Sequence, residues 1–180
     1  MHVTALYRHP IKSHGREALK QFNLIKGRPI AFDRLWAIAH DQSRADGSEW
    51  ATCFNFSRGS KAPMLMAINA SLDEETELVT LTHPDRPTVT LHPEKDADAL
   101  LAWMMPLVPQ DRALPARVLR LDDRGFTDTD FPSVSLCNSA SHKAVEELTK
   151  MPLSPLRWRG NIWFDGEIPW EEFDWMGRDI

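Results

Sequence analysis

The chain has 180 residues, of which 42% are apolar and 26% are charged, and its formal net charge is −5. This length suits one ordinary domain or two small packed ones, and the composition is typical of a globular protein. No run of about 18 apolar residues occurs, so we expect no membrane-spanning segment. The opening stretch MHVTALYRHP reaches an arginine and a proline too early for a signal peptide, so we expect a cytoplasmic protein.

The charge is unevenly distributed along the chain. Residues 1–30 contain six cations and one anion, which gives +5 there and leaves −10 for the remainder. An acidic protein with one basic segment is not expected to bind nucleic acid generally, because that requires a broad positive surface. The basic segment can instead surround one small anion, or it can be an ordinary solvated face.

Alternating apolar residues predict the first strands. Residues 3–9 alternate up to Pro10, which should end the strand, and residues 20–25 alternate in the same way. Residues 33–41 are apolar on both faces between charged ends, which indicates a buried central strand.

The middle of the chain predicts a hairpin followed by a helix. Residues 64–72 and 77–83 flank the polar loop DEET and should pair, and residues 88–93 should form one more short strand. Residues 94–108 begin with acidic side chains and continue with apolar ones at helical spacing, so they predict a helix that Pro106 ends or kinks.

The last third of the chain adds strands and a second helix. Strands are expected at residues 116–123, 132–136 and 157–166, and a helix capped by Asn138 or Ser139 is expected through Leu148. In total we expect roughly eight or nine short strands and two helices, which predicts a mainly β fold of the α+β class. The strands should form a barrel-like structure with the helices packed outside.

Common catalytic signatures do not occur. The sequence contains no phosphate-binding P-loop, no GxGxxG after a strand, no GxSxG, no HExxH and no paired CxxC, so we expect no metal ligand set. Cys53 and Cys137 are expected to be half-buried free thiols. An alternative is a nucleophilic pair of Cys137 and His142 at a strand-to-helix junction, where the helix N-terminus would favour a thiolate.

Three polar patches remain as candidate sites. They are Lys12 with Ser13 after the first strand, Asp33 with Arg34 before the buried strand, and Arg159 with Asn161 on the polar face of a later strand. A buried arginine requires an anion or a carbonyl group as partner. That partner can be a bound ligand, or a structural carboxylate such as Asp33, Asp128 or the acidic C-terminal segment.

Four segments resemble blocks of the MOSC family, the sulfurase C-terminal family that handles the molybdenum cofactor. They are LYRHPIKS, FDRLWAIAHD, FTDTDFPSVSLCNSASHKAVEEL and RWRGNIWFDGEIPWEEFDWMGRDI, in the family's order and spread over nearly the whole chain. The resemblance implies a MOSC-type β-barrel, with an N-terminal β-barrel-like module over residues 1–122 and the first part of the MOSC domain over residues 123–180. Within the family, the sequence is most similar to the amidoxime-reducing branch.

The resemblance also implies a cofactor site. It places Lys12, Ser13 and Arg34 beside the phosphate and pterin of the molybdenum cofactor, and it lines the same pocket with Asp128, Thr129, Arg159 and Asn161. Lysine and arginine suit a phosphate, and serine and asparagine suit the mixed donors and acceptors of a pterin edge. We expect the other two cations of this segment, Arg16 and Lys20, to be ordinary solvated surface charges.

By resemblance, the expected activity is a molybdenum-dependent reduction of N-hydroxylated compounds, with electrons supplied by partner proteins. The family's conserved thiol follows a Gly-Arg-x-[Ile/Leu] block, and this sequence ends at GRDI. We therefore expect the barrel to be incomplete, the thiol ligand to be missing, and an open sheet edge to allow self-association. The catalytic residues stay unassigned.

Two other functions remain open. The chain can be a non-catalytic module that binds the cofactor, another anion or a partner protein. It can also be a sulfur carrier. The pyridoxal-phosphate domain of a cysteine desulfurase is not part of this sequence, so that activity would require a separate partner protein.

Overall fold

The computed structural model describes residues 1–179, which divide into two compact units. The large unit comprises Arg8–Glu17 and Phe22–Ser133. The small unit comprises Met1–Tyr7, Ala18–Gln21 and the residues from Val134 onward. Within the described residues, hydrogen bonds join the strands into three separate sheets, and none of these sheets closes into a barrel.

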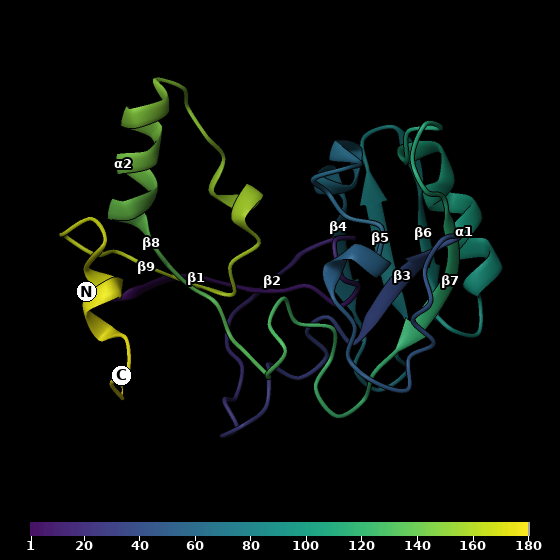
Figure 1. Ribbon diagram of the computed structural model, residues 1–180, viewed down its shortest axis with the longest axis horizontal. Helices are drawn as coiled ribbons and strands as arrows, with labels where there is room; N and C mark the ends of the chain where they lie inside the picture. The colour runs from purple at the N-terminus through teal and green to yellow at the C-terminus, as the bar shows by residue number, and fades with distance from the viewer. Residues whose placement is uncertain (180) are drawn as a thin grey trace. The chain divides into compact units, whose positions relative to one another are not determined.

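The large unit contains two sheets and one α-helix (Figure 1). Strand β3 (Trp36–His40) pairs antiparallel with β7 (Pro115–Arg120). Strands β4 (Asn69–Leu72), β5 (Val79–His83) and β6 (Arg86–Leu91) form an antiparallel meander. The helix α1 (Ala97–Met104) packs against β6 and β7.

The core of the large unit lies on both faces of β3. Trp36 and Ile38 point into the main apolar cluster, together with residues of β5 and α1, whereas Ala37 and Ala39 pack in a second cluster with Phe56 and Phe126. The expectation of a buried strand is therefore confirmed. Beyond its pairing with β7, β3 makes single bridges to Ile11 and Phe56.

The small unit is built on a sheet of order β2-β1-β9-β8. Its strands are β1 (Val3–Arg8), β2 (Glu17–Leu19), β8 (Leu136–Asn138) and β9 (Ile162–Phe164). The helix α2 (Ser139–Thr149) begins directly after β8, and the Asn138 side chain accepts a hydrogen bond from the Ala140 amide as the expected cap. Because β8 and β9 are parallel neighbours, β8, α2 and β9 form a βαβ unit.

Short 3₁₀ helices complete the structure. They are η1 (Cys53–Asn55), η2 (Pro63–Ala67), η3 (Met105–Leu107), η4 (Pro155–Trp158) and η5 (Glu171–Trp175). The predicted helix over residues 94–108 is confirmed in its centre, and it changes to the 3₁₀ form of η3 at Pro106, whose missing amide hydrogen cannot continue an α-helix.

Two predicted strands are wrong. Residues 20–25 form no strand, because Leu24 and Ile25 are both 61% exposed and their alternation has no core to face. Residues 132–135 are irregular, and the strand begins only at Leu136. The mainly β character with two α-helices is confirmed, and no helix among residues 1–179 is long and apolar enough to cross a bilayer.

Candidate functional site

A tight turn after β1 positions Lys12. Ile11 and His14 bridge each other across Lys12 and Ser13, and Ser13 adopts a positive φ of 65°. The Lys12 amide donates to the Trp36 carbonyl at 2.7 Å, which fixes the turn against β3. As a result Lys12 is only 3% exposed, and Ser13 remains half-buried.

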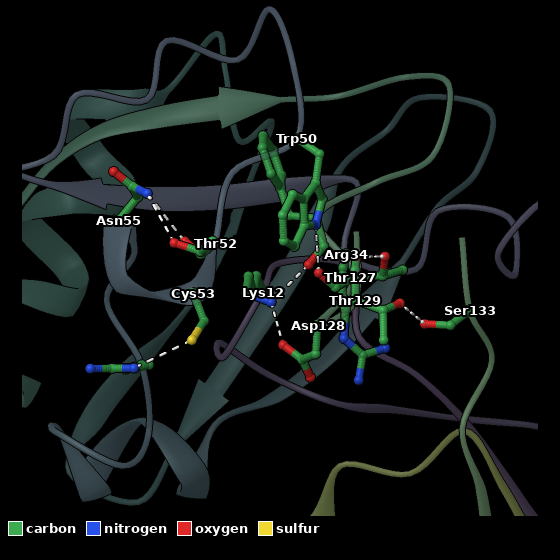
Figure 2. A network of polar contacts seen from close by, with 12 residues as sticks. Lys12, Arg34, Trp50, Thr52, Cys53, Asn55, Thr127, Asp128, Thr129 and Ser133 are labelled. Carbon is green, nitrogen blue, oxygen red and sulfur yellow. Dashed lines mark hydrogen bonds and ion pairs between the residues drawn. The ribbon is translucent and has the colours of Figure 1, made fainter. Parts of the chain in front are cut away.

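The buried Lys12 ammonium is held by the segment that follows β7. Its Nζ donates to the Phe126 carbonyl at 2.8 Å and to Asp128 Oδ1 at 2.5 Å, and Figure 2 shows the two side chains pointing toward each other. Burial lowers the pKa of Lys12, and the nearby Arg34 charge lowers it further, whereas Asp128 acts in the opposite direction. The site therefore holds a lysine whose charge is poorly solvated.

Arg34 is another buried cation of the large unit. It adopts a positive φ of 54°, its amide donates to the His9 carbonyl at 2.7 Å, and its guanidinium pairs with the neighbouring Asp33. Burial alone would raise the pKa of Asp33, but the Arg34 charge and the hydrogen bonds from His9 outweigh it and hold that pKa well below its ordinary value. Asp33 is therefore a buried carboxylate that stays ionised.

A glycine allows the chain to bring Asp128 to Lys12. The Phe126 amide donates to the Arg34 carbonyl at 2.7 Å, directly after Gly125, which has a φ of +59°. A Cβ at Gly125 would lie 2.6 Å from the Asp33 carbonyl oxygen, so only glycine fits this close approach. The contact links the Asp33–Arg34 patch to the Lys12 patch.

Thr129 is bound within its own loop rather than directed at Lys12. Its hydroxyl donates to the Phe131 carbonyl at 2.6 Å. It also contacts the Ser133 hydroxyl at 2.9 Å (Figure 2). The preceding Thr127 carbonyl accepts from the Trp50 indole at 2.8 Å. Together these bonds order residues 127–133 as a polar loop beside the two buried cations.

The other two predicted residues belong to the small unit. Asn161 is 1% exposed, donates to the Tyr7 carbonyl at 3.1 Å and accepts from the Ser135 amide at 3.2 Å, so it joins β1 to the segment before β8. Arg159 is half-buried and ends η4 with a φ of 53°. The predicted set thus falls on both units, with Lys12, Arg34 and Asp128 brought together inside the large one.

One residue near Lys12 was not expected to matter. Cys53 lies close enough to Lys12 to influence the pKa of the lysine, and its Sγ accepts a hydrogen bond from Arg58 Nη1 at 3.3 Å. It is half-buried, as predicted for both cysteines. Because its partners are distant in the sequence or belong to an irregular loop, no spacing pattern signals this contact.

The alternative nucleophilic pair receives no support. The His142 ring nitrogens contact the Leu153 carbonyl and the Trp158 indole, each at 3.0 Å. Burial raises the pKa of Cys137, so its thiol is kept protonated rather than activated.

The structure changes the expectation for Arg16. Arg16 is half-buried and donates to the Met66 carbonyl at 2.7 Å, so it is not a solvated surface charge, whereas Lys20 is exposed as expected.

Glu77, His92 and Glu94 lie close enough together to hold a metal ion. However, Arg120 donates to both carboxylates, at 2.6 Å for Glu77 and 3.1 Å for Glu94, and its charge offsets part of theirs.

Comparison with known proteins gives one family. The model of the MOSC N-terminal beta barrel domain matches residues 1–112. Comparisons with curated proteins and with solved structures returned no match. The matched residues include the Lys12 turn and the Asp33–Arg34 patch, and they span more than half of the 180 residues. The chain therefore belongs to the family that carries the MOSC N-terminal β-barrel domain.

Proposed function

We propose that the chain binds the molybdenum cofactor, with Lys12 and Arg34 holding the phosphate of its pterin. MOSC proteins are associated with this cofactor, and the matched domain contains both cations. The single observation that carries the proposal is that these two cations are almost fully buried in the same unit, at 3% and 7% exposure. Two buried cations near one another are unfavourable unless anions neutralise them.

The arrangement of carboxylates suits exchange with a phosphate. Asp33 is buried and pairs with Arg34, so it is a permanent partner. Asp128 pairs with Lys12, but its own side chain is 70% exposed. A phosphate can therefore replace Asp128 at Lys12, and the released carboxylate returns to water at little cost.

A further predicted residue of the large unit lies next to Lys12. Ser13 is half-buried in the same turn, and its hydroxyl can donate to or accept from a bound cofactor. The cofactor, when bound, supplies the molybdenum that accepts and donates electrons in reduction of N-hydroxylated compounds. This chain's residues bind and orient it, and partner proteins deliver the electrons.

Metal and pterin analysis of the full chain tests the proposal. The chain would be expressed in a host that makes the cofactor, with Lys12→Met as the site variant and Lys26→Met, an exposed cation, as the control. We expect molybdenum and pterin fluorescence to copurify with the parent and with Lys26→Met, and to be lost from Lys12→Met. Absence of both from the parent would overturn the proposal.

A second candidate is a non-catalytic anion-binding module. The observation that favours it is the internal pairing of both cations, Lys12 with Asp128 and Arg34 with Asp33, which balances both charges without a cofactor. Titration with a phosphorylated pterin separates the candidates, because this module would bind the pterin phosphate while purifying without molybdenum. Self-association through an open sheet edge and a cytoplasmic location remain predictions.

A further inference from the structure

A second pocket of the large unit lies away from Lys12 and Arg34. It surrounds the end of β3 and the segment after η1, and its volume is about 170 Å³. That is about ten times the roughly 10–15 Å³ needed for a single water. The residues lining it are His40, Phe54, Phe56, Ser57, Arg58, Lys61, Ala62, Val108, Arg112 and Ala113.

The lining combines cationic and apolar side chains. Arg58, Lys61 and Arg112 contribute three cations, and none of the described residues that line the pocket is acidic. The Arg58 guanidinium lies over the Phe54 ring, 4.7 Å from its centroid, which restrains the arginine at the pocket wall. An anion entering here meets converging positive charge without a competing carboxylate in the wall.

Buried polar atoms at this pocket lack partners. Ser57 is 6% exposed, and its hydroxyl has no hydrogen-bond partner within the described part of the chain. His40 Nδ1 is likewise buried without a partner there, while His40 Nε2 contacts the Phe54 carbonyl at 2.7 Å. A buried hydroxyl without a partner is unfavourable, and rotation of the Ser57 side chain toward the pocket would let a ligand oxygen satisfy it.

We propose that this pocket binds a phosphate group, free or as the ester of a small apolar molecule. The cations neutralise its charge, with Arg58 and Arg112 able to form charge-assisted bonds, and the Ser57 hydroxyl donates to one of its oxygens. The walls formed by Phe54, Phe56 and Val108 suit an apolar substituent on the ester. This site is independent of the proposed cofactor site, because neither Lys12 nor Arg34 lines it.

Calorimetric titration of the full chain tests the proposal with two probes, inorganic phosphate and phenyl phosphate. Binding of both identifies the phosphate group as the recognised chemistry. Tighter binding of phenyl phosphate identifies an ester as the favoured source, and equal binding identifies the free ion. Failure of both probes to bind would overturn the proposal.

Variants locate the site and separate it from the cofactor pocket. We expect Lys61→Met and Arg112→Met each to weaken phosphate binding about tenfold, as loss of a charge-assisted bond would. Arg44→Met, an exposed cation outside the pocket, should bind as the parent does. Loss of binding in Lys12→Met alone would place the phosphate at the cofactor site and would overturn this proposal.

Ser57→Ala gives a test that does not depend on charge. Removal of a buried hydroxyl without a partner should leave the melting temperature of the free protein unchanged or raised. The same substitution should weaken phosphate binding about threefold, the effect of one ordinary hydrogen bond. A lowered melting temperature with unchanged affinity would show that Ser57 serves only the fold and would contradict its role here.

Discussion

Lys12 Nζ and Asp128 Oδ1 lie 2.5 Å apart, yet the lysine side chain is 4% exposed and the aspartate side chain is 70% exposed. The two residues are separated by 116 positions in the sequence, so the pair forms only when the segment after β7 returns to the turn after β1. The lysine is held by burial, whereas most of the aspartate side chain is exposed to water. The pair therefore combines a permanent cation with a replaceable anion.

Replacement of Asp128 by asparagine should strengthen anion binding at Lys12. The amide keeps the shape of the side chain but no longer competes with the charge of an incoming phosphate. We expect the affinity for a phosphorylated pterin, measured by fluorescence titration, to rise by up to about tenfold, as loss of one exposed ion pair would allow. Asp130→Asn, two residues away and also exposed, is the matched control. An unchanged affinity in Asp128→Asn would contradict competition between Asp128 and the phosphate, and a weakened affinity would show that Asp128 is itself a ligand of the pterin.

Because of the Asp33–Arg34 pair, the free energy of unfolding should decrease as the pH falls into the acid range. The pKa of Asp33 in the folded chain lies below the unfolded value of about 3.9, so its stabilisation is fully present above that pH and is lost as the pH falls through the folded pKa. In Asp33→Asn we expect a loss of about 3–5 kcal/mol at pH 7, because Arg34 is left buried without its carboxylate. Urea unfolding from pH 7 to pH 2 should show this difference narrowing below about pH 4. A difference that stays constant over the whole range would contradict the assignment.

Arg8 offers a comparison of a buried with an exposed partner. Its guanidinium contacts Glu17 at 2.8 Å and Glu74 at 2.5 Å, and the two glutamate side chains are 12% and 56% exposed. Glu17 also accepts from the Leu72 amide at 3.0 Å, which ties β4 to the basic segment. We expect Glu17→Gln to lower the free energy of unfolding by about 3 kcal/mol or more and Glu74→Gln by less than about 1 kcal/mol. Equal losses in urea unfolding would show that burial does not decide the strength of these pairs.

Elements whose signals are local could be predicted from the sequence. The alternation of Val79 and Leu81 with threonines predicts β5, and the acidic start and Pro106 set the extent of α1. Each of these signals depends only on residues that are close together in the sequence. Residues 20–25 show the limit of the same approach. Their alternation is as regular as that of β1, but no other element covers Leu24 and Ile25.

The candidate site was predictable in its residues but not in its arrangement. The cluster of cations before residue 30 first suggests a solvated face, and nothing local indicates that Lys12 is buried while Lys20 is exposed. The difference arises from Phe126, whose carbonyl covers Lys12 from 114 positions away. The positive φ of Arg34 was also unpredictable, because that conformation normally favours glycine and here the contacts of the folded chain impose it.

Gly125 and Gly27 both have a positive φ, and substitution of each by alanine distinguishes the cost of backbone strain from the cost of a steric clash. An alanine at Gly27 would meet nothing within 4 Å, so Gly27→Ala should cost only about 1 kcal/mol for the positive φ. An alanine at Gly125 would place Cβ 2.6 Å from the Asp33 carbonyl oxygen, so Gly125→Ala should cost about 1–3 kcal/mol more. Because relief of that clash moves Phe126 and Asp128 away from Lys12, Gly125→Ala should also alter binding of a phosphorylated pterin, whereas Gly27→Ala should not. Urea unfolding and fluorescence titration of both variants measure these effects, and equal behaviour of the two would mean that the approach of residues 125–128 to Arg34 does not organise the site.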